Sequence, residues 1–154
     1  MFSANPDGSN LKLVLRDGMV SHFDWRNDEE LLVWTRINGH GDHFYLVNER
    51  TGAYEIVGPK YLAQDGHCSY SHNGRWILTD TYPDPKTLLR TLKVYIPDQD
   101  REVILGHFFS PPLFAGEIRC DLHPRWSPDD RRICFDSTHE GHRQVYVLDV
   151  PDLE

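Results

Sequence analysis

Hydrophobic and polar residues alternate over short stretches of this chain, and clusters of Asn, Asp, Gly, Pro and Ser separate those stretches. Almost no window shows the 3.6-residue periodicity of an amphipathic helix. Short alternating or apolar runs bounded by turn residues are typical of β-strands. The pattern therefore predicts an all-β protein whose strands are joined by tight turns.

Three segments of the chain share one pattern, in which a histidine is followed by an aromatic residue three positions later, a polar turn and an apolar run. The three pairs are His22 with Trp25, His67 with Tyr70, and His123 with Trp126. The histidines lie 45 and 56 residues apart. A repeat of this period, built from short strands, indicates a β-propeller, in which four-stranded antiparallel sheets called blades surround an axis.

The repeat divides the chain into blades whose strands we name A to D from the axis outward. In the second blade, strands A to D are expected near residues 67–71, 75–80, 91–96 and 102–105. The blades cover residues 1–18 (strands C and D), 19–58, 64–106 and 120–151 (strands A to C). The sequence thus predicts one partial propeller domain of about three and a half blades.

This blade count leaves the propeller open. Complete propellers close with about four to eight blades, so apolar faces and strand edges would remain uncovered. Either the chain is the C-terminal half of a longer propeller, or copies of it assemble as a homo-oligomer that closes the ring.

Antiparallel strands place the start of strand A, the end of strand B and the B–C and D–A connections on one face of the propeller. We therefore expect His22, His67 and His123 to surround the mouth of the axis there. Asp80 and Asp136, which end two B strands, should lie on the same side. The aromatic residue after each histidine should point away from this mouth and pack between blades.

Three converging imidazoles favour a divalent metal site. Gln64, three residues before His67, can supply an oxygen ligand, and Asp80 and Asp136 can orient the imidazole rings from behind. The alternative is structural, because a histidine that is useful for packing one blade is copied into every blade when the repeat duplicates. A third explanation is that the histidines act in catalysis or ligand binding without a metal. The residues alone leave all three explanations open.

Composition excludes some classes of partner. The net charge of −8 disfavours nucleic acid as a partner, and the longest apolar runs are too short to cross a membrane.

The N-terminal residues lack the basic start and apolar stretch of a signal peptide. The three cysteines have no CxxC spacing and do not suggest disulfides. We therefore expect a cytoplasmic protein.

The segments around His67 and His123, the second reading His-Pro-Arg-Trp-Ser-Pro-Asp, resemble the TolB-type (WD40-like) propeller repeat, and the resemblance covers nearly the whole chain. Within that superfamily, the repeated histidine and the Gln64-x-x-His67 spacing look most like oligogalacturonate lyase. This resemblance implies manganese held in a central cavity by Gln64 and His67, with His22 and His123 as further candidate ligands. Ser69 stands where a second nearby histidine is expected.

The same resemblance implies β-elimination on uronate oligosaccharides. The metal would bind the uronate carboxylate and acidify the C5 proton, a base would remove that proton, and the glycosidic oxygen would leave. The sequence does not identify the base. The candidates for binding other substrate carboxylates are Arg119, Arg125, Arg143 and Lys86. Two rival functions are a non-catalytic scaffold for protein interaction and a sugar-binding module without chemistry.

Overall fold

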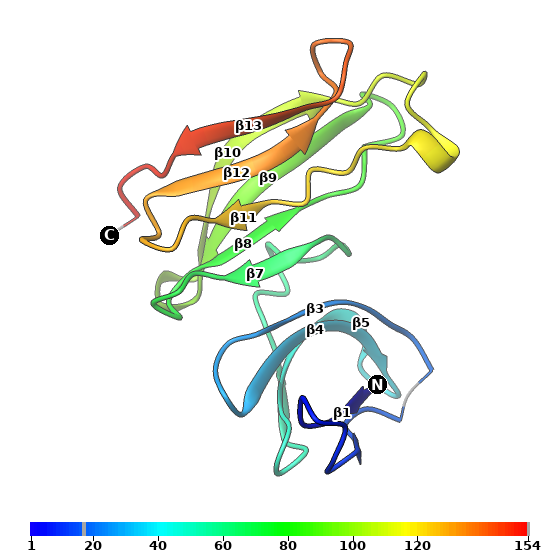
Figure 1. The fold of residues 1–154 in the computed structure, drawn as a ribbon, viewed down its shortest axis with the longest axis vertical. Coiled ribbons are helices and arrows are strands. Elements are labelled where there is room, and N and C mark those ends of the chain that lie inside the picture. The colour runs from blue at the N-terminus through cyan, green and yellow to red at the C-terminus, as the bar shows by residue number, and fades with distance from the viewer. Residues whose placement is uncertain (17, 154) are drawn as a thin grey trace.

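The computed structural model describes residues 1–16 and 18–153. In these residues the chain forms short β-strands in four antiparallel sheets, none of them closed, and two single-turn 3₁₀ helices, Pro97–Gln99 and Gly116–Ile118 (Figure 1). The predictions of an all-β protein and of a partial propeller are confirmed. None of the described helices is long and apolar enough to span a membrane.

The strand order in each sheet follows the chain, as expected for propeller blades. The first large sheet contains β3 (Val20–Trp25), β4 (Glu30–Ile37), β5 (Gly41–Asn48) and β6 (Tyr54–Ile56). The second contains β7 (Cys68–Tyr70), β8 (Ile77–Asp80), β9 (Leu89–Ile96) and β10 (Arg101–Phe109). The third contains β11 (Arg125–Trp126), β12 (Arg132–Ser137) and β13 (Gln144–Asp149), and an N-terminal pair contains β1 (Phe2–Ser3) and β2 (Lys12–Leu13).

Strand β10 is longer than the sequence predicts. It continues past the expected end at residue 105 to Phe109, because a register shift between Ile104 and Gly106 lets its pairing with β9 resume. The ring of Phe108 then packs against Phe135 of the third sheet. Residues 107–109, which lie beyond the expected end of the second blade at residue 106, are therefore part of a strand.

The core lies between the faces of successive sheets. Side chains on a strand alternate between its two faces, so Ile77 of β8 packs toward the first sheet and its neighbour Leu78 packs toward the third. Both are fully buried. Strands β3, β7 and β11 are each the first strand of their sheet, and they occur in that order from the first sheet to the third (Figure 1).

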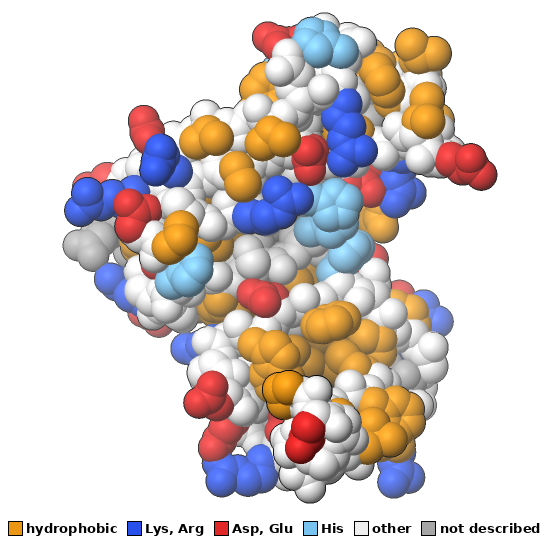
Figure 2. All heavy atoms as spheres, viewed as in Figure 1, with side chains coloured by type: hydrophobic (Ala, Val, Ile, Leu, Met, Phe, Trp, Pro, Cys, Tyr) orange, Lys and Arg blue, Asp and Glu red, His pale blue; other side chains and the backbone are white. Residues whose placement is uncertain are grey.

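The repeated aromatic residue is buried in two sheets and exposed in one. Tyr70 and Trp126 are each 8% exposed, because the preceding sheet covers them, whereas Trp25 is 43% exposed. The N-terminal segment does not cover Trp25. The apolar cluster that this segment forms with the first sheet includes Leu15, Val33 and Tyr45 but not Trp25. The prediction that all three aromatics belong to the core is therefore wrong for Trp25. Figure 2 shows hydrophobic side chains on this N-terminal part of the surface.

Candidate metal centre

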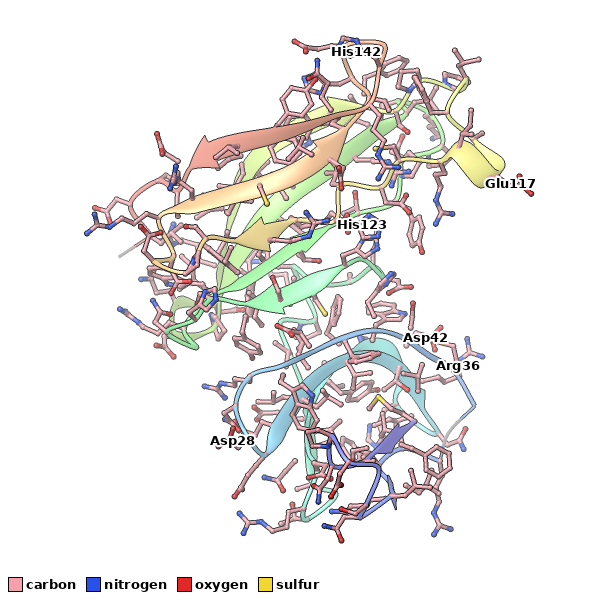
Figure 3. All side chains as sticks on the ribbon, viewed as in Figure 1. Asp28, Arg36, Asp42, Glu117, His123 and His142 are labelled. Atoms are coloured by element: carbon pink, nitrogen blue, oxygen red, sulfur yellow. The ribbon has the colours of Figure 1, made fainter. Side chains whose placement is uncertain are left out.

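The three repeated histidines lie side by side although they come from three different sheets. His22 belongs to β3, His67 directly precedes β7, and His123 lies two residues before β11. The ring centroids of His22 and His67 are 4.2 Å apart, and those of His67 and His123 are 3.8 Å apart. Figure 2 shows histidine side chains gathered between the upper and lower sheets, and Figure 3 labels His123.

The ring of His67 is fixed by Asp80, the last residue of β8. Nδ1 of His67 lies 3.0 and 3.1 Å from the two carboxylate oxygens of Asp80. The same carboxylate accepts the backbone N–H of His67 at 2.7 Å and that of His123 at 3.2 Å. Asp80 is only 2% exposed. One buried carboxylate therefore orients an imidazole and ties the second sheet to the third.

The ring of His22 is fixed by a carboxylate that the sequence analysis did not single out. Nδ1 of His22 lies 2.8 Å from Oδ1 of Asp65, and the hydroxyl of Ser21 donates to Oδ2 of Asp65 at 2.8 Å. Asp65 sits in the connection between β6 and β7, which crosses the histidine face. This connection thus supplies a partner for the ring from the neighbouring sheet.

The third imidazole rests on a backbone oxygen. Nδ1 of His123 lies 3.4 Å from the carbonyl oxygen of Asp121. The backbone of His123 has φ of 42°, in the left-handed region, and Pro124 follows it. A residue with a side chain is strained there, so the bond from its N–H to Asp80 helps to hold the turn.

Gly66 makes the close packing around His67 sterically possible. A Cβ atom at Gly66 would lie 2.0 Å from the backbone oxygen of Asp80. Only glycine permits this approach. The residue before the histidine therefore sets how closely the connecting segment and the end of β8 can meet.

Asp121 is a second acidic residue of the site that the sequence analysis missed. It is 5% exposed, and its Oδ1 lies 2.8 Å from Arg90, which is itself buried. Its Oδ2 receives Arg119 through Nε at 2.9 Å and Nη2 at 2.8 Å. One carboxylate oxygen of Asp121 and one nitrogen each of His67 and His123 lie within 4.8 Å of one another.

The predicted arginines lie around acidic residues next to this cluster. The Arg119 guanidinium lies over the ring of Tyr82 at 5.7 Å, and that ring is 6.5 Å from the ring of His22. Arg125 and Arg143 approach the Asp136 carboxylate at 3.5 and 3.9 Å. Asp136, expected to orient an imidazole, is thus placed beside two arginines instead.

Gln64 and Lys86 both have exposed side chains. Gln64 lines a cavity of about 320 Å³ together with Lys60, Lys93 and Asp80, the partner of His67. Lys86 is exposed in the turn before β9, where its backbone N–H donates to Asp84. Among the described residues, no hydrogen bond joins either side chain to the three imidazoles.

Two cysteines are next to the site in sequence. Burial raises the pKa of the Cys68 thiol well above its usual range, and burial also raises the pKa of Cys120. Among the described residues, the group whose donor atoms lie close together consists of imidazole nitrogen and carboxylate oxygen and includes no cysteine sulfur.

No protein-family model and no curated protein sequence matches the chain. Solved structures do match it. TolB from Acinetobacter baumannii has a TM-score of 0.74 at 19% identity over 96% of this chain. An oligogalacturonate lyase in complex with manganese has a TM-score of 0.75 at 19% identity over 98%, and the oligogalacturonate lyase of Vibrio parahaemolyticus has 0.70 at 19% over 99%.

The chain spans 34%, 41% and 42% of the lengths of these three structures. At this level of identity the likeness shows the fold, and it agrees with the strand order and the face-to-face packing of the sheets. The chain therefore has the fold of the TolB-like β-propellers and forms an open part of such a propeller.

Proposed function

We propose that this chain is a metal-dependent, carbohydrate-active propeller domain whose divalent cation is held by His22, His67 and His123. One observation carries the proposal. In each imidazole, Nδ1 faces an oxygen, from Asp65, Asp80 or the carbonyl of Asp121. A ring that donates from Nδ1 keeps its lone pair on Nε2, which is how metal-binding histidines are normally held.

The Nε2 atoms of the three rings are available to a ligand. No hydrogen bond involves them within residues 1–16 and 18–153, and none of them is a buried atom without a partner. Imidazole nitrogen with nearby carboxylate oxygen suits manganese, iron or zinc. We favour manganese because one similar structure is an oligogalacturonate lyase in complex with that metal.

The surroundings of the histidines suit an acidic sugar. Four guanidinium groups contact only two carboxylates, those of Asp121 and Asp136, and three of the four side chains are more than half exposed, so their remaining N–H groups can donate to a ligand carboxylate. These four groups belong to Arg90, Arg119, Arg125 and Arg143. Tyr82, 42% exposed, offers a ring beside His22 on which a sugar can lie.

The proposed reaction is β-elimination on uronate oligosaccharides. A bound cation would act as a Lewis acid on the uronate carboxylate and acidify the neighbouring proton. The arginines would pair with the remaining carboxylates and orient the chain of sugars. Asp65 and Asp80 would keep the imidazoles turned toward the cation throughout.

A direct assay tests this function. Incubation with trigalacturonate and Mn²⁺ is expected to raise the ultraviolet absorbance of the unsaturated uronate product, and a chelator should stop the rise. The matched control replaces Mn²⁺ by an equal concentration of Mg²⁺, which prefers all-oxygen sites. Metal binding without any absorbance change would leave a sugar-binding module, and absence of metal binding would overturn the proposal.

We also propose that further propeller sheets cover the open faces of the first and third sheets. Trp25 and Phe23 are exposed on one face, and Val145 and Val147 on the other. Assembly with a second copy is expected to double the 18.0 kDa mass in sedimentation velocity. A monomer that binds a hydrophobic dye would indicate that the open faces are covered by further polypeptide outside this sequence. A monomer that binds no dye would contradict the proposal.

A further inference from the structure

We infer that Asp121, rather than Gln64, completes the cation site with His67 and His123, and that Arg119 competes with the cation for this carboxylate. The inference rests on the proposed function in one respect, namely that a cation binds the histidines. It departs from the ligand set that the resemblance implies, in which a glutamine supplies the oxygen.

The distances favour Asp121. Donor atoms that share one ion at about 2.1 Å lie at most roughly 4.2 Å from each other. The candidate atoms of His67, Asp121 and His123 already lie within 4.8 Å of one another. A small closing movement therefore suffices, and the imidazole of His123 is only two residues from the carboxylate.

Gln64 offers a weaker ligand. Its side chain is exposed, lines a cavity that Asp80 also lines, and makes no hydrogen bond to His67 or His123 among the described residues. Asp121 also brings a negative charge to the cation, which an amide does not. Because Ser69 stands where a further histidine is expected, a charged oxygen ligand would compensate for the missing nitrogen.

The two arginines bound to Asp121 play different roles. Arg90 is 3% exposed and its Nη2 lies 2.8 Å from Oδ1, but no hydrogen bond joins them, so Oδ1 is a buried carboxylate oxygen that accepts none among the described residues. The Arg119 side chain is 51% exposed and holds Oδ2. A divalent cation on this carboxylate repels the Arg119 guanidinium, and a cation on Oδ2 would also need the lone pairs that the guanidinium occupies.

Displacement would free Arg119 for another carboxylate. Its guanidinium already lies over Tyr82, which neighbours His22, at the edge of the histidine cluster. Cation binding would therefore raise the affinity of this edge for an anionic ligand, and by linkage the anionic ligand would raise the affinity for the cation.

Calorimetric titration with Mn²⁺ alone tests the competition. Arg119→Ala is expected to bind Mn²⁺ roughly two- to fivefold more tightly than the wild type, because an exposed ion pair of modest strength no longer has to be broken. Arg143→Ala is the matched control. It removes the same charge from the same face, but its partner is Asp136. The gain should therefore appear for Arg119→Ala beyond any gain for Arg143→Ala.

Ligand variants complete the test. Asp121→Asn is expected to weaken Mn²⁺ binding at least about tenfold, whereas Gln64→Ala should bind as the wild type does. Asp121→Asn leaves the buried Arg90 less well paired, so thermal unfolding checks that this variant is folded. If Asp121→Asn is unfolded, the comparison of Arg119→Ala with the wild type decides, because Arg119 is exposed. Equal affinities of Arg119→Ala and Arg143→Ala, or a loss confined to Gln64→Ala, would overturn the inference alone. A wild type that binds no cation would overturn the proposed function as well.

Discussion

Replacing His67 by alanine is expected to lower the affinity for a divalent cation at least about 100-fold. His67 is the central ring of the three, in contact with His22 on one side and His123 on the other. Its loss removes one ligand and also the surface against which the other two rings pack. The measurement is the amount of metal that the purified protein retains after dialysis, together with calorimetric titration.

His72→Ala is the matched control for this experiment. Nδ1 of His72 lies 3.0 Å from Asp130 and its backbone N–H donates to the same carboxylate, so it forms a histidine–aspartate pair like that of His67. It lies in an exposed turn away from the cluster. If His67→Ala keeps its metal as His72→Ala does, and only its thermal stability falls, the histidines serve packing and the metal site is refuted.

Replacing Asp80 by alanine is expected to destabilise the fold by about 3–5 kcal/mol. The carboxylate accepts two backbone N–H groups and the ring of His67 in the interior, and all three donors would be left without it. Two of these bonds fix the positions of His67 and His123 relative to each other. The free energy of unfolding in urea, compared with that of the wild type, measures the loss.

Asp42→Ala provides the comparison for Asp80. Asp42 also pairs with a basic side chain, Arg36, but both are on the surface, as the labelled side chains in Figure 3 show. A much smaller change is expected because solvent replaces the lost contact. Equal effects of the two substitutions would mean that burial of Asp80 contributes nothing to holding the sheets together.

The repeat made the convergence of the histidines predictable. Alternation and turn residues identify the strands, and the repeat superposes His22, His67 and His123 before any coordinates are known. The same logic failed for Trp25, because equivalence in sequence says nothing about whether a preceding sheet is present to cover the residue. It also failed at β10, where a register shift between Ile104 and Gly106 lets the strand continue, and where the glycine is itself a signal for a bulge rather than for the end of the strand.

The acidic partners were harder to predict because only two of the three repeats carry them. Asp65 and Asp121 occupy the same position before their histidines, in connections of different length, whereas Val20 stands there in the first repeat. Their contacts depend on the path of each loop over the histidine face. Their only common signal is position, since each precedes a repeated histidine by two residues, and a carboxylate at that spacing can reach the mouth of the axis.

Strand β13 is the last of its sheet, and its outer edge pairs with no other strand in the described part of the chain. Its backbone amides and carbonyls on that edge have no strand partner among the described residues, next to a face that carries the exposed Val145 and Val147. Such an edge can pair with an extended peptide, including the same edge of a second copy of the chain. The solubility of the free chain therefore depends on electrostatic repulsion between its negatively charged copies. High salt screens this repulsion and mild acid reduces the charge, so both are expected to cause aggregation under conditions in which the sheets are still folded.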